Sequence, residues 1–379
     1  MGIIEEYLSL TTQYCKEYGD KTIVLMQVGS FFEVYGLQEA DGTYTGSSIT
    51  EFSRLNDMMI ANKTNTTHYG KPVVMAGFGV TVLEKNVKKL QDGGYTIVVY
   101  QQDIHGKNTS RSLLEIISPG TYFGCDSKVM SNNTMCVWLH KSPATKITNE
   151  TLIIGVSNVD IYTGRVTISQ LELDSFHNPC TYDELERLVT VNRPSECILV
   201  TNIDRDIVLE IMQFVGLDQV KHHIACSGTR LGEDALNAEK QVYQQEVFRK
   251  FFPNHEESFI GLIQDNYFAI QSLTLLLDFV YRHSPYLVAK LSFPEVQASA
   301  ERLTLANHSL KQLNILDDTR HSGKLRSVSS LLNNCTTTMG KRRFTHIICN
   351  PITDHIKLTR IYKMTEHLLG QCGKWEEYR

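Results

Sequence analysis

The hydrophobic pattern at the start of the chain alternates between short apolar strands and amphipathic helices. Thr22–Val28 and Phe31–Tyr35 are rich in β-branched and aromatic residues, and Gly29-Ser30 between them predicts a tight turn or bulge. Around this hairpin the pattern predicts helices over Ile3–Tyr18 and Thr81–Asp92, strands over Asp57–Ala61, Tyr95–Tyr100 and Ser112–Ile117, a short apolar run over Val73–Gly79 and a polar loop over Asn62–Gly70. We expect a mixed α/β unit of about 120 residues.

The second strand of the hairpin carries an unusual pair of side chains. Period-two alternation places Phe32 and Val34 on one face, and Phe31, Glu33 and Tyr35 on the other. If Phe32 and Val34 face a core, Phe31 and Glu33 lie together on an open surface beside a glycine turn. Most aromatic residues in short strands belong to a core. The alternative is an apolar side chain that inserts between base steps, with a carboxylate that contacts the exposed base edge.

After about residue 121 the pattern predicts three strands and then helix, strand, helix, strand. This order is typical of an α/β sheet of RNase-H-like type. Capping boxes of the form Thr-x-x-Glu predict helix starts at Thr81 and Thr181. The predicted strands cover Met135–His140, Thr151–Asp160, Arg165–Leu173, Cys197–Val200 and Val220–Cys226, and the helices cover Thr181–Asn192 and Asp206–Val215.

From about Gly232 the pattern is almost entirely helical. The predicted helical segments are Asp265–Arg282, Arg302–Leu316, Val328–Cys349 and Thr353–Leu369. The last helix has no evident partner within the chain, which indicates a truncated protein. The sequence thus predicts a multidomain fold in which two α/β units precede an incomplete all-α unit.

Composition adds limits to this picture. The chain has 379 residues, 42% hydrophobic and 21% charged, as is typical of soluble multidomain proteins, and no apolar run reaches the roughly 18 residues of a membrane span. Its nine cysteines are odd in number and include no C-x-x-C pair, which favours reduced thiols in an intracellular protein. A net charge of −5 argues against a nucleic-acid coat but allows a local DNA-binding face.

Motifs for nucleotide and metal chemistry are absent from the sequence. No G-x-x-x-x-G-K-[ST] loop and no H-E-x-x-H occurs. A two-metal nuclease site on an RNase-H-like sheet needs several converging carboxylates. Asp160 stands at a strand end, but the neighbouring strands Cys197–Val200 and Val220–Cys226 contribute none, and His222-His223 is interpreted as a strand edge. A nuclease therefore remains an unfavoured alternative.

Two stretches lack acidic residues and carry basic ones. The first runs between Asp57 and Glu84 and contains Lys63, His68 and Lys71. The second runs between Asp318 and Asp354 and contains Arg320, Lys324, Arg326, Lys341, Arg342 and Arg343. Such side chains can neutralise DNA phosphates, and they can equally form a solvated surface.

Several motifs in one order resemble the MutS family of DNA mismatch-repair proteins. Gly29–Tyr35 resembles the family's G-D-F-Y-E-L-F motif, with Ser30 in place of Asp. Further similarities are Pro72–Gly77 to P-M-A-G, Ile117–Thr121 to T-P-G-T, Asp160–Gly164 to D-x-S-T-G, Leu303–Ile315 to the segment with R-N-L-E, Thr338–Arg343 to T-P-M-G-x-R, and Asn350–Asp354 to P-x-x-D. Gly79-Val80-Thr81 departs from the family's P-Y-H. The resemblance covers essentially the whole chain.

The resemblance implies a division of labour within the chain. Residues 1–120 correspond to a mismatch-recognition domain, 121–230 to a connector of RNase-H-like fold, and 231–379 to the start of a helical core and lever. In the family the motif phenylalanine stacks on a mispaired base from the minor groove and the glutamate hydrogen-bonds that base; here these are Phe31 and Glu33. Additional DNA contacts are expected from Lys63, Lys71 and Met75, and the basic group Lys341, Arg342 and Arg343 is expected to contact phosphate or core.

The resemblance also implies partners and location. The ligand is duplex DNA with mismatches or small loops, and a homo- or heterodimer forms through a region beyond Arg379. The resemblance implies that residues 1–379 hold no cofactor and no catalytic activity, and that a C-terminal ATPase outside them uses ATP and Mg. The protein is expected inside the cell, in cytoplasm or nucleus, and not in a membrane. One alternative stays open beside the nuclease: a MutS-like interaction scaffold without mismatch recognition.

Overall fold

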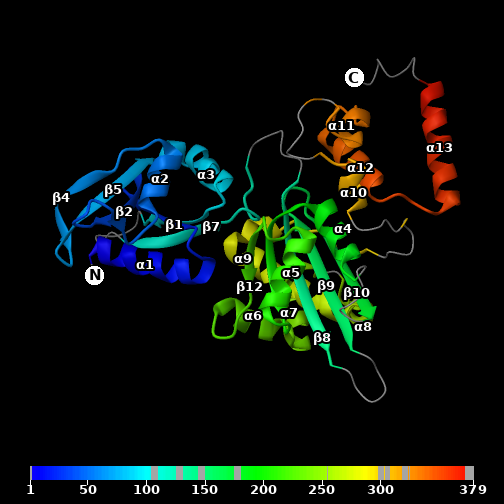
Figure 1. Ribbon diagram of the computed structural model, residues 1–379, viewed down its shortest axis with the longest axis horizontal. Helices are drawn as coiled ribbons and strands as arrows, with labels where there is room; N and C mark the ends of the chain where they lie inside the picture. The colour runs from blue at the N-terminus through cyan, green and yellow to red at the C-terminus, as the bar shows by residue number, and fades with distance from the viewer. Residues whose placement is uncertain are drawn as a thin grey trace.

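A computed structural model describes residues 2–103, 110–124, 131–143, 150–174, 181–253, 255–297, 303, 308–317, 323 and 325–371. Two mixed β-sheets are followed by helices (Figure 1). This order confirms the predicted change from α/β units to an all-α part. Of the expected helical segment Arg302–Leu316, residues 303 and 308–316 are described, and only Ser309–Gln312 among them is helical. Arg320 and Lys324 lie outside the described residues.

The first sheet has its strands in the order β4-β5-β2-β1-β6-β7, with the short β3 paired to β2. These strands are β1 (Thr22–Val28), β2 (Phe31–Gln38), β3 (Tyr44–Thr45), β4 (Ala61–His68), β5 (Lys71–Gly79), β6 (Thr96–Gln102) and β7 (Arg111–Ile117). Helix α1 (Ile3–Tyr18) lies on one side of the sheet, and α2 (Ile49–Asn56) and α3 (Leu83–Asp92) lie on the other (Figure 1). Both faces of the sheet are therefore covered over part of their area.

Aromatic side chains form the core on each face of this sheet. On the α1 face the rings of Tyr7 and Tyr35 meet edge to face, with centroids 5.1 Å apart. On the opposite face the Phe78 ring lies 6.1 Å from that of Phe32 and 5.9 Å from that of Phe52. The predicted alternation along β2 is confirmed, but α1 covers part of the face that was expected to be open.

The second sheet has the order β12-β11-β8-β9-β10-β13. Its strands are β8 (Asn133–Ser142), β9 (Thr151–Asp160), β10 (Arg165–Asp174), β11 (Pro194–Thr201), β12 (Lys221–Ile224) and β13 (Glu295–Val296). Helices α4 (Asp183–Asn192) and α5 (Arg205–Val215) share one apolar core with the sheet, and α9 (Tyr267–His283) packs on β8, β9 and β10. A Cβ at Gly155 would lie 2.3 Å from the Phe268 carbonyl, so this glycine allows α9 to approach β9 closely.

The remaining helices are short or little buried. They are α6 (Arg230–Ala238), α7 (Gln241–Phe251), α8 (Glu256–Asp265), α10 (Ser309–Gln312), α11 (Val328–Leu332), α12 (Thr338–Cys349) and α13 (His355–Gly370). The predicted helix Asp265–Arg282 is confirmed to within two residues as α9, and Asn266, with φ −137°, separates it from α8. The predicted helical segment Val328–Cys349 is instead two helices, α11 and α12. Helix α13 has no buried residue among the described part of the chain.

The predictions around the first sheet's edge are wrong in two places. The expected polar loop Asn62–Gly70 is mostly strand β4, and the expected strand Asp57–Ala61 is the connection between α2 and β4. Strand β4 lies at the edge of the sheet, where both polar side chains and Thr are common. Because such a strand buries no continuous face, its sequence does not show the apolar alternation that identifies inner strands.

Neither predicted capping box forms. Helix α3 begins after a 3₁₀ turn over Val80–Val82, and its N-cap, Val82, makes no side-chain capping bond. Helix α4 has Tyr182 as its N-cap, again without a side-chain capping bond. The threonines of both patterns therefore lie one residue outside the position from which a hydroxyl can reach the helix N–H groups.

A buried polar cluster fixes the chain where it leaves the first sheet. The Glu196 side chain of β11 is fully buried, and its Oε1 lies 2.6 Å from His223 Nε2. Its Oε2 accepts hydrogen bonds from the Ser118 hydroxyl and from the Gly120 N–H, the latter at 3.0 Å. Ser118 follows β7 directly, so Glu196 joins the two sheets.

Contacts of α1 add to this junction. Lys221 Nζ donates to the Tyr18 carbonyl at 3.0 Å, and the Tyr18 ring lies 5.4 Å from that of His283. His283 is buried, and its Nδ1 lies 2.7 Å from the Phe279 carbonyl oxygen. The first sheet is thus held against the second by specific polar and aromatic contacts.

Acid is expected to weaken the fold through His283. Burial lowers the pKa of this imidazole from 6.5 to about 4. Between about pH 6.5 and pH 4 the ring stays neutral in the folded protein, whereas the same histidine binds a proton in the unfolded chain. The free energy of unfolding therefore falls by about 3 kcal/mol as the pH decreases through this range. Urea unfolding at several pH values should show this loss, and His283→Gln should flatten it. An equally steep profile in the variant would contradict the assignment.

Candidate functional site

The turn between β1 and β2 is braced from both sides. Gly29 has φ +60°, which favours glycine, and its N–H donates to Gln102 Oε1 at 2.8 Å. On the opposite side the Val80 N–H donates to the Ser30 carbonyl at 3.0 Å. Arg111 Nε donates to the Gln27 carbonyl at 2.8 Å, next to the end of β1. The backbone that carries the next residue, Phe31, is therefore fixed by strands on either side.

Phe31 is the exposed apolar residue that the alternation predicts. It is 54% exposed, whereas the adjacent Phe32 is 4% exposed and packs in the core. Leaving a phenylalanine half in solvent forgoes much of the stabilisation that burial gives. A rigid turn that presents such a side chain is suited to contact an apolar ligand surface.

Glu33 does not share this open position, contrary to the expectation from alternation. It is 9% exposed, and its Oε2 accepts a hydrogen bond from the Tyr35 hydroxyl. Lys63 Nζ lies 3.4 Å from the same oxygen and 2.9 Å from the Tyr35 hydroxyl oxygen. Burial, and then the bond to Glu33, raise the pKa of Tyr35 well above its ordinary value, so this hydroxyl remains a donor.

Two glycines stand opposite these side chains on β5. Phe31 pairs with Gly79 and Glu33 pairs with Gly77, and directly opposed residues share a face. Gly77 is exposed, and a Cβ there would lie 2.5 Å from the Phe32 carbonyl and 3.3 Å from Glu33 Cγ. The glycines in Val73–Gly79 were the available sequence signal, because glycine inside a strand often marks a close approach of backbone or ligand.

The other predicted site residues of the first sheet lie at different depths. Met75 is half-buried and pairs with Tyr35. Lys71 pairs with His68 at the end of β5 remote from Gly79, and its Nζ lies 2.6 Å from Glu39 Oε1. The structure thus brings Lys63 and Met75 close to the Glu33–Tyr35 pair and places Lys71 at the opposite end of the strand.

The basic group Lys341, Arg342 and Arg343 lies on α12. Lys341 and Arg342 are half-buried and Arg343 is exposed. The helix has Thr337 as its N-cap, whose Oγ1 accepts a hydrogen bond from the Gly340 N–H at 3.1 Å. Figure 1 shows α12 well apart from the first sheet. The group therefore forms no single surface with Phe31 in this structure.

Carboxylates of the second sheet serve the fold. Asp160 Oδ1 accepts the N–H groups of Asn132 and Tyr162, each at 3.1 Å, and Oδ2 accepts from the Thr163 hydroxyl at 2.7 Å. The expectation that the neighbouring strands lack an acid is wrong, since Glu196 lies on β11, but it is fully buried and hydrogen-bonded. Both carboxylates are thus engaged by protein donors. Within the described ranges, no three His, Cys, Asp or Glu residues gather as metal ligands.

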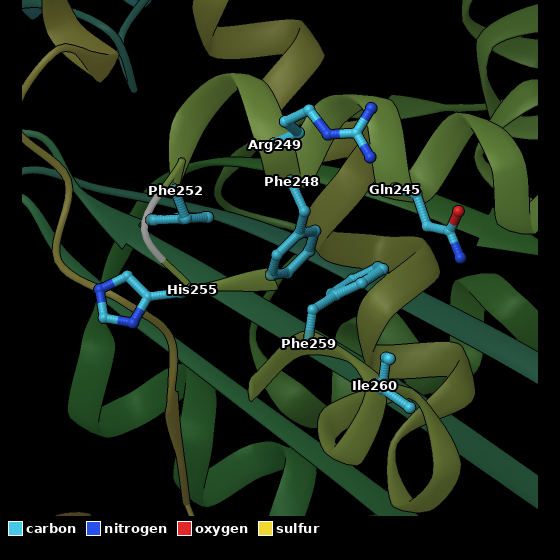
Figure 2. Close-up of a pocket in the computed structure, with 7 residues that line it drawn as sticks. All are labelled: Gln245, Phe248, Arg249, Phe252, His255, Phe259 and Ile260. Atoms are coloured by element: carbon cyan, nitrogen blue, oxygen red, sulfur yellow. The ribbon is translucent and has the colours of Figure 1, made fainter. Parts of the chain in front are cut away.

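A pocket of about 200 Å³ lies between α7 and α8, and three of its seven lining residues are phenylalanines (Figure 2). The rings of Phe248 and Phe259 are 4.1 Å apart there, and His255 and Arg249 stand at its edge. None of the predicted site residues lines it. Across the part of the chain that the structure describes, no helix combines the length and apolar character needed to cross a membrane.

Comparisons with known proteins cover the first sheet in one case and most of the chain in others. Residues 2–126 match the family model MutS domain I. A protein of Acanthamoeba polyphaga mimivirus, named as a mutS homolog for DNA mismatch repair, is 28% identical over 375 residues, which are 93% of this chain and 33% of the homolog. The DNA mismatch repair protein MutS of Prochlorococcus marinus is 23% identical over 95% of this chain and 36% of its own length. The DNA mismatch repair protein MutS of Methanosarcina barkeri is 23% identical over 96% of this chain and 38% of its own length. The chain spans about a third of the length of these relatives.

Proposed function

Because this chain is a divergent member of the MutS family, we propose that it binds duplex DNA at mispaired bases or small loops as the recognition part of a mismatch-repair protein. The observation that carries this proposal is Phe31, half exposed on a braced turn with the Glu33 carboxylate on the same face of β2. A rigid apolar side chain next to a hydrogen-bonding group is the combination that a minor-groove wedge needs.

In this mechanism Phe31 inserts at the mispaired step and Glu33 contacts the displaced base edge. Unstacking a step costs a few kcal/mol, and the cost is smallest where pairing is already lost. A wedge therefore selects the most deformable step, with little direct readout of sequence. Gly77 and Gly79 leave the β5 backbone uncovered beside the two side chains, which allows close approach of the duplex.

We also propose the division of the chain that the motifs imply. Residues 1–120 act as the recognition domain, 121–230 as the connector and 231–379 as the start of the core and lever. Support for an RNase-H-like connector comes from strands β8 to β12, whose spatial order is third, second, first, fourth, fifth. An ATPase and a dimer interface belong to this proposal as parts of a longer protein.

Binding titrations test the proposed function. The full chain is titrated with two fluorescent duplexes that differ only in a single G·T mismatch. We expect the mismatched duplex to bind at least about tenfold more tightly than the matched one. This ratio corresponds to a difference of about 1.4 kcal/mol in binding free energy, because less energy is needed to unstack the mispaired step. Affinity for both duplexes should fall with salt, because phosphate contacts release counterions. Equal affinities for the two duplexes would contradict the proposal.

A further inference from the structure

We propose that Tyr35 and Lys63 are positioning residues that hold one oxygen of Glu33, so that the other oxygen selects bases presenting an N–H donor. The inference rests on the proposed function and deepens it. It describes how Glu33 would select a base by the hydrogen-bonding groups on its edge, whereas Phe31 selects a base step only by how easily it is deformed.

The contacts of Glu33 are one-sided. The Tyr35 hydroxyl and Lys63 Nζ both lie against Oε2. Within the described residues, Oε1 accepts no hydrogen bond. A carboxylate held through one oxygen has its rotation restricted, and its second oxygen points in a defined direction. The side chain is thereby prepared for one further hydrogen bond.

Lys63 supplies the charge that a poorly exposed carboxylate requires. Its Nζ lies 2.9 Å from the Tyr35 hydroxyl and 4.2 Å from the centroid of the Tyr35 ring, so one lysine contacts both partners of the pair. Ionised Glu33 accepts hydrogen bonds and cannot donate them. Thymine N3–H and guanine N1–H are donors that become free when pairing is lost, and a base edge with acceptors alone would be repelled.

The approach to Glu33 is open on the β5 side. The residue opposite is Gly77, which is exposed and has no side chain to cover the carboxylate. Phe31 stands two residues before Glu33, at the edge of the same face. A base displaced at the wedge would therefore meet the carboxylate on the side that the Tyr35–Lys63 pair leaves free.

Tyr35 offers a conservative way to test this arrangement. It stands where the motif G-D-F-Y-E-L-F ends in phenylalanine, so its hydroxyl is an addition to that pattern. Tyr35→Phe removes the hydroxyl and keeps the ring that packs on Tyr7. Tyr69→Phe is a matched control, because it deletes a hydroxyl from the turn between β4 and β5, at a residue that is 87% exposed.

The experiment compares two duplexes with the full chain. One contains a G·T mismatch, and the other replaces this thymine with a nonpolar isostere that lacks N3–H. Wild type should prefer the thymine duplex by about tenfold, the size expected for one hydrogen bond to a charged group. Tyr35→Phe and Lys63→Met should reduce this ratio to about threefold or less, while Tyr69→Phe keeps it.

An unchanged ratio in Tyr35→Phe would overturn the inference. A second measurement separates this outcome from failure of the proposed function. Urea unfolding without DNA of Tyr35→Phe, Glu33→Gln and the double variant should show non-additive losses, because the two residues interact directly. Additive losses would also overturn the positioning role. If the losses are non-additive but the protein does not distinguish mismatched from matched DNA, the positioning of Glu33 by Tyr35 is supported and the proposed function is rejected.

Discussion

Phe31→Ala is expected to abolish the preference for mispaired over matched duplex while weak, salt-sensitive binding of both remains. The aromatic ring is the group that fills the opened step, and alanine is too short to do so. The affinity for mismatched DNA should fall by about tenfold or more, to that of matched DNA, because unstacking is no longer compensated. The measurement is a fluorescence titration of both duplexes at two salt concentrations.

A control variant shows whether this loss is specific to the turn. Phe123 is 56% exposed, close to the 54% of Phe31, and its ring lies 4.8 Å from that of Tyr162. Phe123→Ala removes the same side chain from a similarly exposed site outside the first sheet and should leave the mismatch preference intact. The stability of Phe31→Ala should change by about 0.5 kcal/mol or less, since it is a surface substitution. Full discrimination by Phe31→Ala would reject the wedge.

Glu196→Gln is expected to produce the largest loss of stability, about 2–3 kcal/mol, since a fully buried carboxylate that accepts hydrogen bonds from protein donors is replaced by an amide. The carboxylate accepts from Ser118 and Gly120 on one oxygen and lies 2.6 Å from His223 on the other. An amide has only one acceptor oxygen, so it cannot reproduce the acceptor capacity that the carboxylate offers on both sides. Urea unfolding followed by circular dichroism at about pH 7 measures the effect.

The control for this substitution is an ion pair at the surface. Glu295 Oε2 lies 2.7 Å from Arg165, with both side chains substantially exposed. Glu295→Gln should change the free energy of unfolding by less than about 1 kcal/mol. Similar losses in the two variants would contradict a special role for the buried cluster.

The effect of Glu196 on stability has a defined pH dependence. Burial raises the pKa of this carboxyl, but His223, His283 and Ser118 together outweigh burial, and the pKa lies below its ordinary value. The stabilisation is thus present above the pKa of the unfolded chain and is lost as the pH falls through the lower folded value. The difference between wild type and Glu196→Gln should therefore shrink in strong acid.

The candidate site was only partly predictable. Alternation along β2 identified Phe31 as exposed, because its neighbour Phe32 fits the core on the other face. The same alternation suggested an exposed Glu33, yet Tyr35 and Lys63 cover it. The loop prediction for the segment that contains Lys63 concealed this contact, since a polar edge strand lacks an apolar period.

By itself the sequence determined the elements whose signals are local: α1, the β1–β2 hairpin with its glycine turn, and the change from sheets to helices. Only the tertiary structure decided which polar groups meet. Lys63 lies 30 residues from Glu33, and Ser118 lies 78 residues from Glu196. The physical reason is that periodicity depends on neighbours along the chain and assigns a side chain to a face. What covers that face depends on the packing of distant strands and helices, and this packing turned an expected surface carboxylate into a buried, held one.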